Sequence, residues 1–203
     1  MEKTYNVCQN VSLQIMAAIE VGLRLPPSTL TKRCVPAASE LRLNHYPSYS
    51  TETLHLGKIK RTWPHTDLGI ITLLFQDAVG GLELEDRKAT HPRTFVPVVP
   101  GPSGEMVVNT SDTLQRWTNG ILTAGMHQVT VPSAMKNMRS EVVPDRYSGV
   151  FFLKAARDVS VGPIPEFVSP ERPAAYDEIT ALHYQQRMTD VLHQNSYRHR
   201  VTA

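Results

Sequence analysis

Eight short segments with β-strand patterns follow one another between residues 40 and 158, and this series constrains the fold more than any other feature of the sequence. Residues 41–46 alternate apolar and polar side chains, as a half-buried strand does, whereas residues 70–75 are a continuous apolar run typical of a strand covered on both faces. The other segments are the one that enters His65 and residues 81–85, 95–99, 106–109, 127–131 and 148–153. Closely spaced strands without alternating helices predict a mainly β protein, either a sandwich or a jelly roll.

Helical patterns flank this β-rich region. From residue 2 to about residue 23, apolar side chains recur every three or four positions, as in an amphipathic helix with one buried face. The residues expected on that face are Val7, Val11, Ile15, Ala18, Ile19 and Gly22. The prolines at 26 and 27 end the helix, because proline lacks a backbone N–H and restricts the residue before it.

A second helix is expected near the C-terminus, over residues 176–194, after a proline-rich connector at residues 163–173. The side chains expected to face the β-rich region are Ile179, Leu182, Val191 and Leu192. We therefore divide the chain into an N-terminal helix and connector (1–36), a β domain (37–158), and a proline-rich connector with a C-terminal helix (159–203).

Composition excludes several classes of function. The net charge of +2, from 21 basic and 19 acidic residues, argues against a nucleic-acid or membrane-surface role that depends on charge. No apolar run approaches the roughly 20 residues of a membrane-spanning helix. Cys8 and Cys34 lie far apart and without metal-ligand spacing, which favours a reducing compartment. We expect a cytoplasmic protein.

Two histidines and one carboxylate stand out against the β pattern. His65 and Asp67 are two residues apart, so on an extended segment both side chains point to the same side. His127 opens a later predicted strand and would supply a third ligand. A single histidine is usually a surface or core residue, but two histidines and a carboxylate on one face of a metal form the facial triad of non-haem Fe(II) oxygenases. The ordered set predicts such an iron site.

Arg146 and Ser148 open the last predicted strand, ahead of the apolar residues 149–153. A guanidinium that enters a core needs a carboxylate partner, because an unpaired buried charge is costly. The sequence offers no such partner at a fixed spacing, so we expect a carboxylate of a ligand to pair with Arg146 and to accept a hydrogen bond from Ser148.

With these residues identified, the chain resembles the 2-oxoglutarate- and Fe(II)-dependent dioxygenases of the isopenicillin N synthase-like family, especially the fungal members. The resemblance covers most of the chain. The motifs that carry it are Leu41-Arg42-Leu43-Asn44-His45-Tyr46-Pro47, His65-Thr66-Asp67-Leu68-Gly69, Thr72-Leu73-Leu74-Phe75-Gln76-Asp77, Gly80-Gly81-Leu82-Glu83, Val107-Val108-Asn109, Asp112, Leu114-Gln115-Arg116-Trp117-Thr118-Asn119 and Arg146-Tyr147-Ser148.

The resemblance implies a double-stranded β-helix, or jelly roll, with iron at its open end. It implies that His65, Asp67 and His127 ligate Fe(II), and that they form the catalytic centre. It also implies that the co-substrate 2-oxoglutarate is bound by Arg146, Ser148 and Tyr46, with a contribution from Asn44. The expected reaction consumes O2 and oxidises a small organic molecule by hydroxylation, desaturation or cyclisation, in specialised metabolite biosynthesis.

The chain departs from the family pattern at two places. It does not show the substantial portion that family members carry before the first helix, so the flank left exposed predicts a partner chain, such as a homo-oligomer, or a shortened gene product. Residues 120–126, ahead of His127, lack the basic residues that the family often has there, which bears on the choice of substrate. The alternatives to a 2-oxoglutarate-dependent enzyme are a same-family oxidase that does not use 2-oxoglutarate and a non-catalytic remnant or accessory subunit.

Overall fold

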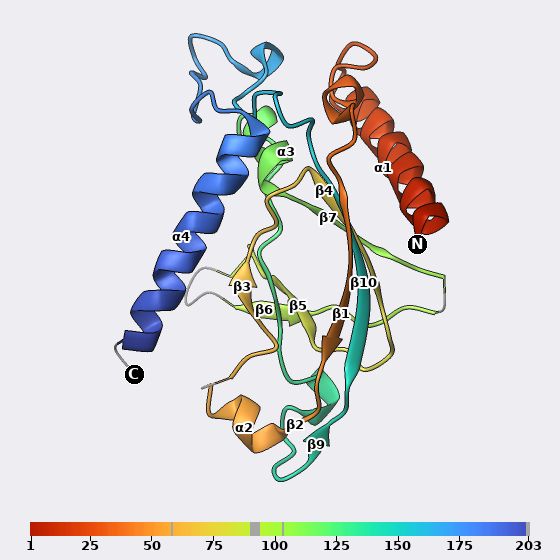
Figure 1. Cartoon of the computed structure of the whole chain (residues 1–203), viewed down its shortest axis with the longest axis vertical. Coiled ribbons are helices and arrows are strands. Elements are labelled where there is room, and N and C mark those ends of the chain that lie inside the picture. Colours follow the sequence, from red (N-terminus) through yellow and green to blue (C-terminus); the bar gives the residue numbers. More distant parts are fainter. Residues whose placement is uncertain (58, 90–93, 103, 202–203) are drawn as a thin grey trace.

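Two four-stranded antiparallel sheets form the centre of the computed structural model (Figure 1). The structure describes residues 1–57, 59–89, 94–102 and 104–201, and only the backbone of residues 192–201. In the first sheet the spatial order is β1 (Glu40–Tyr46), β10 (Arg146–Leu153), β4 (Ile71–Gln76) and β7 (Val107–Thr110). In the second sheet the order is β3 (Thr62–His65), β8 (His127–Val129), β5 (Leu82–Glu85) and β6 (Phe95–Pro97). The prediction of a mainly β jelly roll flanked by helices is confirmed.

Shorter elements close the ends of the two sheets. A two-stranded ribbon joins β2 (Tyr49–Ser50) to β9 (Val142–Val143). The helices are α1 (Glu2–Gly22), α2 (Thr51–His55), α3 (Asp112–Trp117) and α4 (Ala181–Val201), with 3-10 turns at Thr31–Cys34, Ser133–Met135 and Pro165–Phe167. Figure 1 shows α2 beside the β2–β9 ribbon, at the end of the molecule away from α3.

The register of the first sheet decides which side chains face inward. Ser148 in β10 lies opposite Asn44 in β1 and Gln76 in β4, so these three side chains share one face of the sheet. The neighbouring residue Gly149 belongs to the other face, which is the one that α1 covers in part. Every second residue of β10, beginning with Arg146, therefore points between the two sheets.

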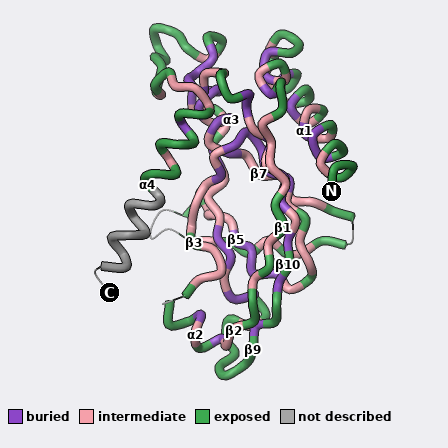
Figure 2. Tube along the Cα trace, in the orientation of Figure 1, coloured by how far each residue is buried: buried purple, intermediate pink, exposed green. Residues whose placement is uncertain are grey.

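α1 packs on the outer face of the first sheet, where the ring of Tyr5 meets the ring of Phe151 edge to face at 5.3 Å between centroids. The residues of the buried core beneath and around the helix are Cys8, Met16, Leu30, Cys34, Ile70, Ile71, Leu73, Leu114, Trp117, Phe151, Leu153, Ala155 and Ile164. The tube in Figure 2 shows the same buried stripe along one side of α1 and along the strands that it covers. Both cysteines are buried and free.

The predicted buried face of α1 is correct only in part, because Val11, Ile15 and Ile19 are partly buried against the core but the most buried side chains lie elsewhere on the helix. The structure buries Cys8, Gln9, Ser12, Met16 and Glu20, which repeat about every four residues. In contrast, Val7 is 54% exposed and Ala18 and Gly22 are also exposed. The sequence pattern misses these positions because Gln9, Ser12 and Glu20 are polar. Glu20 gains hydrogen-bond donors from the connector, whereas Gln9 Oε1 and Ser12 Oγ have no partner among the described residues.

Glu20 is the most consequential of these buried polar residues. The residue is 4% exposed, and its carboxylate accepts backbone N–H donors from Ser28 at 3.0 Å, Leu30 at 2.6 Å and Thr31 at 2.7 Å. Burial alone would raise the pKa of Glu20, but these hydrogen bonds outweigh it and hold the pKa below its ordinary 4.5. The carboxylate thus fixes the connector that leads from α1 to β1.

The C-terminal helix also differs from expectation. α4 begins at Ala181, five residues later than predicted, and Leu182 and Val191 are 42% and 43% exposed. The side chain of Leu192 lies outside the described residues. Among the side chains of this helix that the structure describes, that of Tyr184 is the buried one, and its hydroxyl donates a hydrogen bond to the Asp112 carboxylate at 3.2 Å. A polar contact, which apolar periodicity cannot reveal, therefore sets the inner face of α4.

Ion pairs hold the beginning of α4 against α3. The buried guanidinium of Arg116 lies 2.7 Å from Asp177, and the same carboxylate also pairs with Arg187 at 2.8 Å. Both guanidiniums stack on the ring of Tyr184, at 4.7 and 5.6 Å. No helix among the described residues is long and apolar enough to cross a membrane.

Replacing Glu20 with alanine should lower the free energy of unfolding by about 2–3 kcal/mol at neutral pH, because three N–H donors lose a charged acceptor. The pKa of Glu20 is depressed in the folded protein, so its contribution is complete above pH 4.5 and is lost as the pH falls through the lowered value. Urea denaturation at several pH values would measure this. Glu2→Ala, at an exposed position of the same helix, is the control. A pH-independent difference between Glu20→Ala and the unchanged protein would contradict this account.

Candidate metal centre

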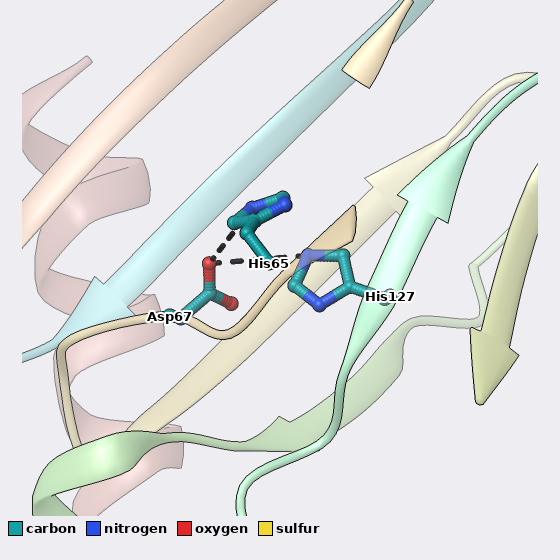
Figure 3. Close-up of side chains that lie close together, drawn as sticks. All are labelled: His65, Asp67 and His127. Atoms are coloured by element: carbon teal, nitrogen blue, oxygen red, sulfur yellow. Dashed lines mark ion pairs between the residues drawn. The ribbon is translucent and has the colours of Figure 1, made fainter. Parts of the chain in front are cut away.

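The three predicted ligands converge between the two sheets (Figure 3). His65 is the last residue of β3 and lies opposite His127, the first residue of β8. Asp67 follows two residues after the end of β3. One Asp67 carboxylate oxygen, Oδ1, lies 3.6 Å from Nε2 of His65 and 3.9 Å from Nε2 of His127. One donor atom from each of the three residues lies within 4.8 Å of the others, so this set of two imidazoles and one carboxylate fits a single divalent first-row metal.

Backbone carbonyls orient both imidazole rings. Nδ1 of His65 lies 2.9 Å from the carbonyl oxygen of Trp63, and Nδ1 of His127 lies 3.0 Å from that of Gly125. A carbonyl can only accept, so Nδ1 carries the proton in each neutral ring and Nε2 keeps its lone pair. Such outer contacts fix the tautomer of metal-binding histidines. Each ring therefore presents an unprotonated nitrogen on the side where the Asp67 carboxylate lies.

The oxygen of the Asp67 carboxylate that does not face the histidines is fixed by a hydrogen bond. This oxygen, Oδ2, accepts the hydroxyl of Thr72 at 2.6 Å, and that hydroxyl in turn lies 3.3 Å from Ser111 Oγ. The backbone carbonyl of Asp67 accepts the N–H of Asp112 at 2.8 Å. Since Oδ2 is occupied in this way, Oδ1 is the oxygen left for a cation.

Charge and burial shift the pKa values of the three groups in different directions. Burial would raise the pKa of Asp67, but the nearby imidazoles of His65 and His127 and the hydrogen bond from Thr72 lower it, so the carboxylate is ionised. For His65, burial is outweighed by Asp67 and the Trp63 carbonyl, and the pKa rises. For His127, burial dominates and the pKa falls. A neutral His127 and an ionised Asp67 are the protonation states that metal binding requires.

A cavity of about 280 Å³ between the sheets joins this group to Arg146. His65, Asp67 and His127 line one part of it. Thr72, next to the triad, and Gln76, next to Arg146, are four residues apart on β4, or about 13 Å along an extended strand. The triad and the guanidinium therefore lie toward opposite ends of one cavity.

Arg146 is a buried cation whose hydrogen-bonding capacity is only partly used. The residue is 1% exposed, its Nη2 donates to Oε1 of Gln76 at 2.8 Å, and its guanidinium lies over the ring of Tyr46 at 5.0 Å. Its Nε and Nη1 are buried and have no acceptor. The pKa of Arg146 is lowered chiefly by burial, which shows how poorly its charge is compensated. An anion entering the cavity would remove this cost.

The other predicted co-substrate residues lie in the same region. Tyr46 lines the cavity, and the hydroxyl of Ser148 accepts a hydrogen bond from Asn44 at 3.4 Å. The structure thus brings all six predicted site residues together. It adds contacts that the sequence did not predict, from Thr72 to Asp67, from Gln76 to Arg146, and from Asn109, whose Nδ2 donates at 3.2 Å to the Gly125 carbonyl that also accepts Nδ1–H of His127.

A second and larger cavity, of about 970 Å³, reaches the triad from the side of α4. His65 and Asp67 line both cavities. The remaining walls of the larger one come from β1, the end of β10 and α4, and they include Glu40, Phe152, Lys154, Leu182 and Gln185. The candidate metal centre is therefore accessible from two directions.

Comparison with known proteins identifies this arrangement. The sequence profile of the 2OG-Fe(II) oxygenase superfamily matches residues 38–155. The 2-oxoglutarate-dependent dioxygenase phqC of Penicillium fellutanum is 54% identical over 92% of the chain and 52% of its own length. The crystal structure of a full-length Neurospora crassa protein in complex with alpha-KG and thymine superimposes with a TM-score of 0.82, at 29% identity, over 94% of the chain and 56% of that protein.

A protein named peptide transporter imqJ, from Aspergillus flavus, is 56% identical over 95% of the chain, which covers 38% of that protein. The chain spans about half the length of the curated relatives that it matches. The superfamily match covers more than half of the chain and includes all three members of the His65–Asp67–His127 group. The chain belongs to the 2OG-Fe(II) oxygenase superfamily, whose cofactors are Fe(II) and 2-oxoglutarate.

Proposed function

We propose that this chain carries the catalytic core of an Fe(II)- and 2-oxoglutarate-dependent dioxygenase that oxidises a C–H bond of a small organic molecule. The observation that supports it most is the pairing of two incomplete sites in one cavity, a two-histidine and one-carboxylate group and a buried guanidinium without an anion. A five-carbon 2-oxo diacid carries two carboxylates, so one can bind beside the metal while the other pairs with the guanidinium. Relatives that share most of this chain are named 2-oxoglutarate-dependent dioxygenases.

In this proposal His65, Asp67 and His127 hold Fe(II), and as metal ligands they are the catalytic residues. The ring tautomers and the Thr72 contact support it, because they leave Nε2 of both histidines and Oδ1 of Asp67 available on one side. Fe(II) held by these three side chains would supply the oxygen-activating chemistry.

Arg146, Ser148 and Tyr46 are proposed to hold the distal carboxylate of 2-oxoglutarate. Arg146 has two buried nitrogens without an acceptor, and a guanidinium binds a carboxylate through parallel hydrogen bonds. Ser148 lies two residues along β10 on the same face, and its hydroxyl proton is free to point at the ligand because Asn44 is the donor in its observed contact. Tyr46 stacks on Arg146 and keeps its planar fork in position.

The larger cavity is the proposed substrate chamber. Its volume of about 970 Å³ lies at the upper end of the range for small-molecule sites, and it opens on the same His65 and Asp67 side chains. One relative, 43% identical, is named a proline hydroxylase, and others are fungal dioxygenases. We therefore propose hydroxylation, desaturation or cyclisation of a specialised metabolite or its precursor.

Anaerobic reconstitution tests this function. Adding Fe(II) and then 2-oxoglutarate should produce a visible charge-transfer absorption, and admitting air should release succinate in an amount limited by 2-oxoglutarate. Iron binding without 2-oxoglutarate binding would instead support an oxidase that does not use this co-substrate. Absence of both would show that this chain is non-catalytic.

His127→Ala should abolish stoichiometric Fe(II) binding, because two side chains cannot hold the metal against water and buffer. Metal analysis of anaerobically loaded and desalted protein measures this. His55→Ala, which changes an exposed histidine of α2, should bind iron like the unchanged protein. Stoichiometric iron in the His127 variant would refute the proposed ligand set.

Thr72→Val should weaken Fe(II) binding by about 10- to 100-fold, because the hydroxyl that orients Asp67 is lost while the volume of the side chain is kept. Competition with a metal-responsive dye gives the affinity. Thr110→Val removes a hydroxyl bonded to the backbone of Thr123, on the opposite face of the sheet, and serves as the control. Equal iron affinities for the two variants would argue against a supporting role of Thr72.

Arg146→Leu should weaken 2-oxoglutarate binding by roughly 1.5–3 kcal/mol, or about 10- to 150-fold, the range for hydrogen bonds to a charged group. Calorimetric titration of the iron-loaded protein without oxygen measures it. Arg146→Lys keeps the charge but loses the planar guanidinium, so its affinity for 2-oxoglutarate should lie between those of the unchanged protein and the leucine variant. An unchanged affinity in the leucine variant would contradict the assignment.

A further inference from the structure

Arg61, immediately before β3, carries a second guanidinium close to Arg146, and this one is half-buried. Its Nη2 donates to the backbone carbonyls of Pro47 at 3.2 Å and Val143 at 3.5 Å, and also to that of Pro144. Its Nε and Nη1 are buried and have no acceptor. This guanidinium therefore has the same unmet demand for an anion as Arg146.

The carbonyls that bind Arg61 connect it to the co-substrate residues. Pro47 directly follows Tyr46, and Pro144 lies two residues before Arg146. Tyr46 and Arg146 are themselves register partners across β1 and β10. Arg61 thus joins the two chain turns from which Tyr46 and Arg146 enter the cavity, and it reaches them from the opposite sheet.

Two cations withdrawn from solvent so close together repel each other. Burial and, second to it, the charge of Arg146 lower the pKa of Arg61. Asp77 influences both guanidiniums, but its carboxylate accepts the backbone N–H groups of Tyr147 and Val79. Asp145 is half exposed and is paired with a histidine of β1 at 2.8 Å. Among the described residues, no carboxylate hydrogen-bonds to either guanidinium.

We propose that Arg61 is a positioning residue that makes the cavity selective for a dianionic 2-oxo acid, a role that rests on the proposed function. Arg146 contacts the distal carboxylate, and Arg61 strengthens that contact by adding positive potential behind it and by holding the turns at Pro47 and Pro144. The anion offsets both charges at once, so a ligand with two carboxylates gains from Arg61, whereas a 2-oxo acid with one carboxylate does not.

Calorimetry with two ligands separates this role from a purely structural one. The iron-loaded protein is titrated without oxygen with 2-oxoglutarate and with 2-oxopentanoate, which has the same chain length but ends in a methyl group. Arg61→Gln should weaken 2-oxoglutarate binding roughly ten-fold, from the loss of one nearby charge partly screened by solvent, and should leave 2-oxopentanoate binding nearly unchanged. Arg61→Lys should restore most of the preference for the diacid.

Arg33→Gln is the matched control, because Arg33 also donates to a backbone carbonyl, that of Thr29, but lies in the connector that follows α1. It should alter neither affinity. If Arg61→Gln does not fold, Arg61→Met, which is of similar length and suits apolar surroundings, takes its place with the same expectation.

Three results would overturn the inference. Equal weakening of both ligands by the Arg61 variant would show that the residue acts only on the structure of the turns. Unchanged binding of both would show that its charge does not reach the cavity. If the unchanged protein binds iron but not 2-oxoglutarate, the proposed function itself fails and the inference fails with it.

Discussion

The metal-binding group and the elements around it depend on the interactions that stabilise the buried carboxylate of Asp67. Asp67 is 8% exposed, and a carboxylate in that position stays ionised only if donors and positive charge surround it. Thr72 supplies the donor from β4, the two histidines supply the nearby partial charge, and the Asp112 N–H binds its carbonyl where α3 begins. One residue thus joins β3, β4, β8 and α3, so the geometry that suits a metal is also the geometry that closes the jelly roll.

The strands could be predicted from the sequence, because a β-strand has a pattern of apolar and polar residues that is visible within a few neighbouring positions. The alternation in residues 41–46 and the apolar run at residues 70–75 are typical of extended segments, and the structure forms β1 and β4 there, although Leu43 is 68% exposed and the inward face of β1 carries Asn44 and Tyr46. The apolar periodicity of the helices was a weaker guide to their buried faces. In α1 the buried positions include Ser12 and Glu20, and no count of apolar residues finds them. The burial of Glu20 is compensated by backbone N–H groups from another part of the chain, which only the fold brings into reach.

The same distinction applies to the site. His65, Asp67 and His127 could be predicted because their chemistry is unusual and their order fits the strands. Their supporting contacts could not, since the Gly125 carbonyl accepts from both Asn109 and His127 only when β4 pairs with β7 and β8 begins at His127. Arg61 was missed for a related reason. An arginine before a strand carries no sequence signal of its own, and only the fold brings it to the ends of β1 and β10.

The two cavities on either side of the triad have a consequence for how such a chain can diversify. The small cavity depends on strand register, because Tyr46, Ser148 and Gln76 face inward only while β1, β10 and β4 stay aligned. The large cavity depends on α4, whose wall residues need no particular pairing. α4 is nevertheless tied to the metal centre, because Tyr184 binds Asp112, and the backbone N–H of Asp112 binds Asp67. Substitutions of the α4 residues that line the large cavity, such as Leu182 and Gln185, can therefore change its shape, while the hydrogen bonds through Tyr184 and Asp112 still connect the helix to Asp67.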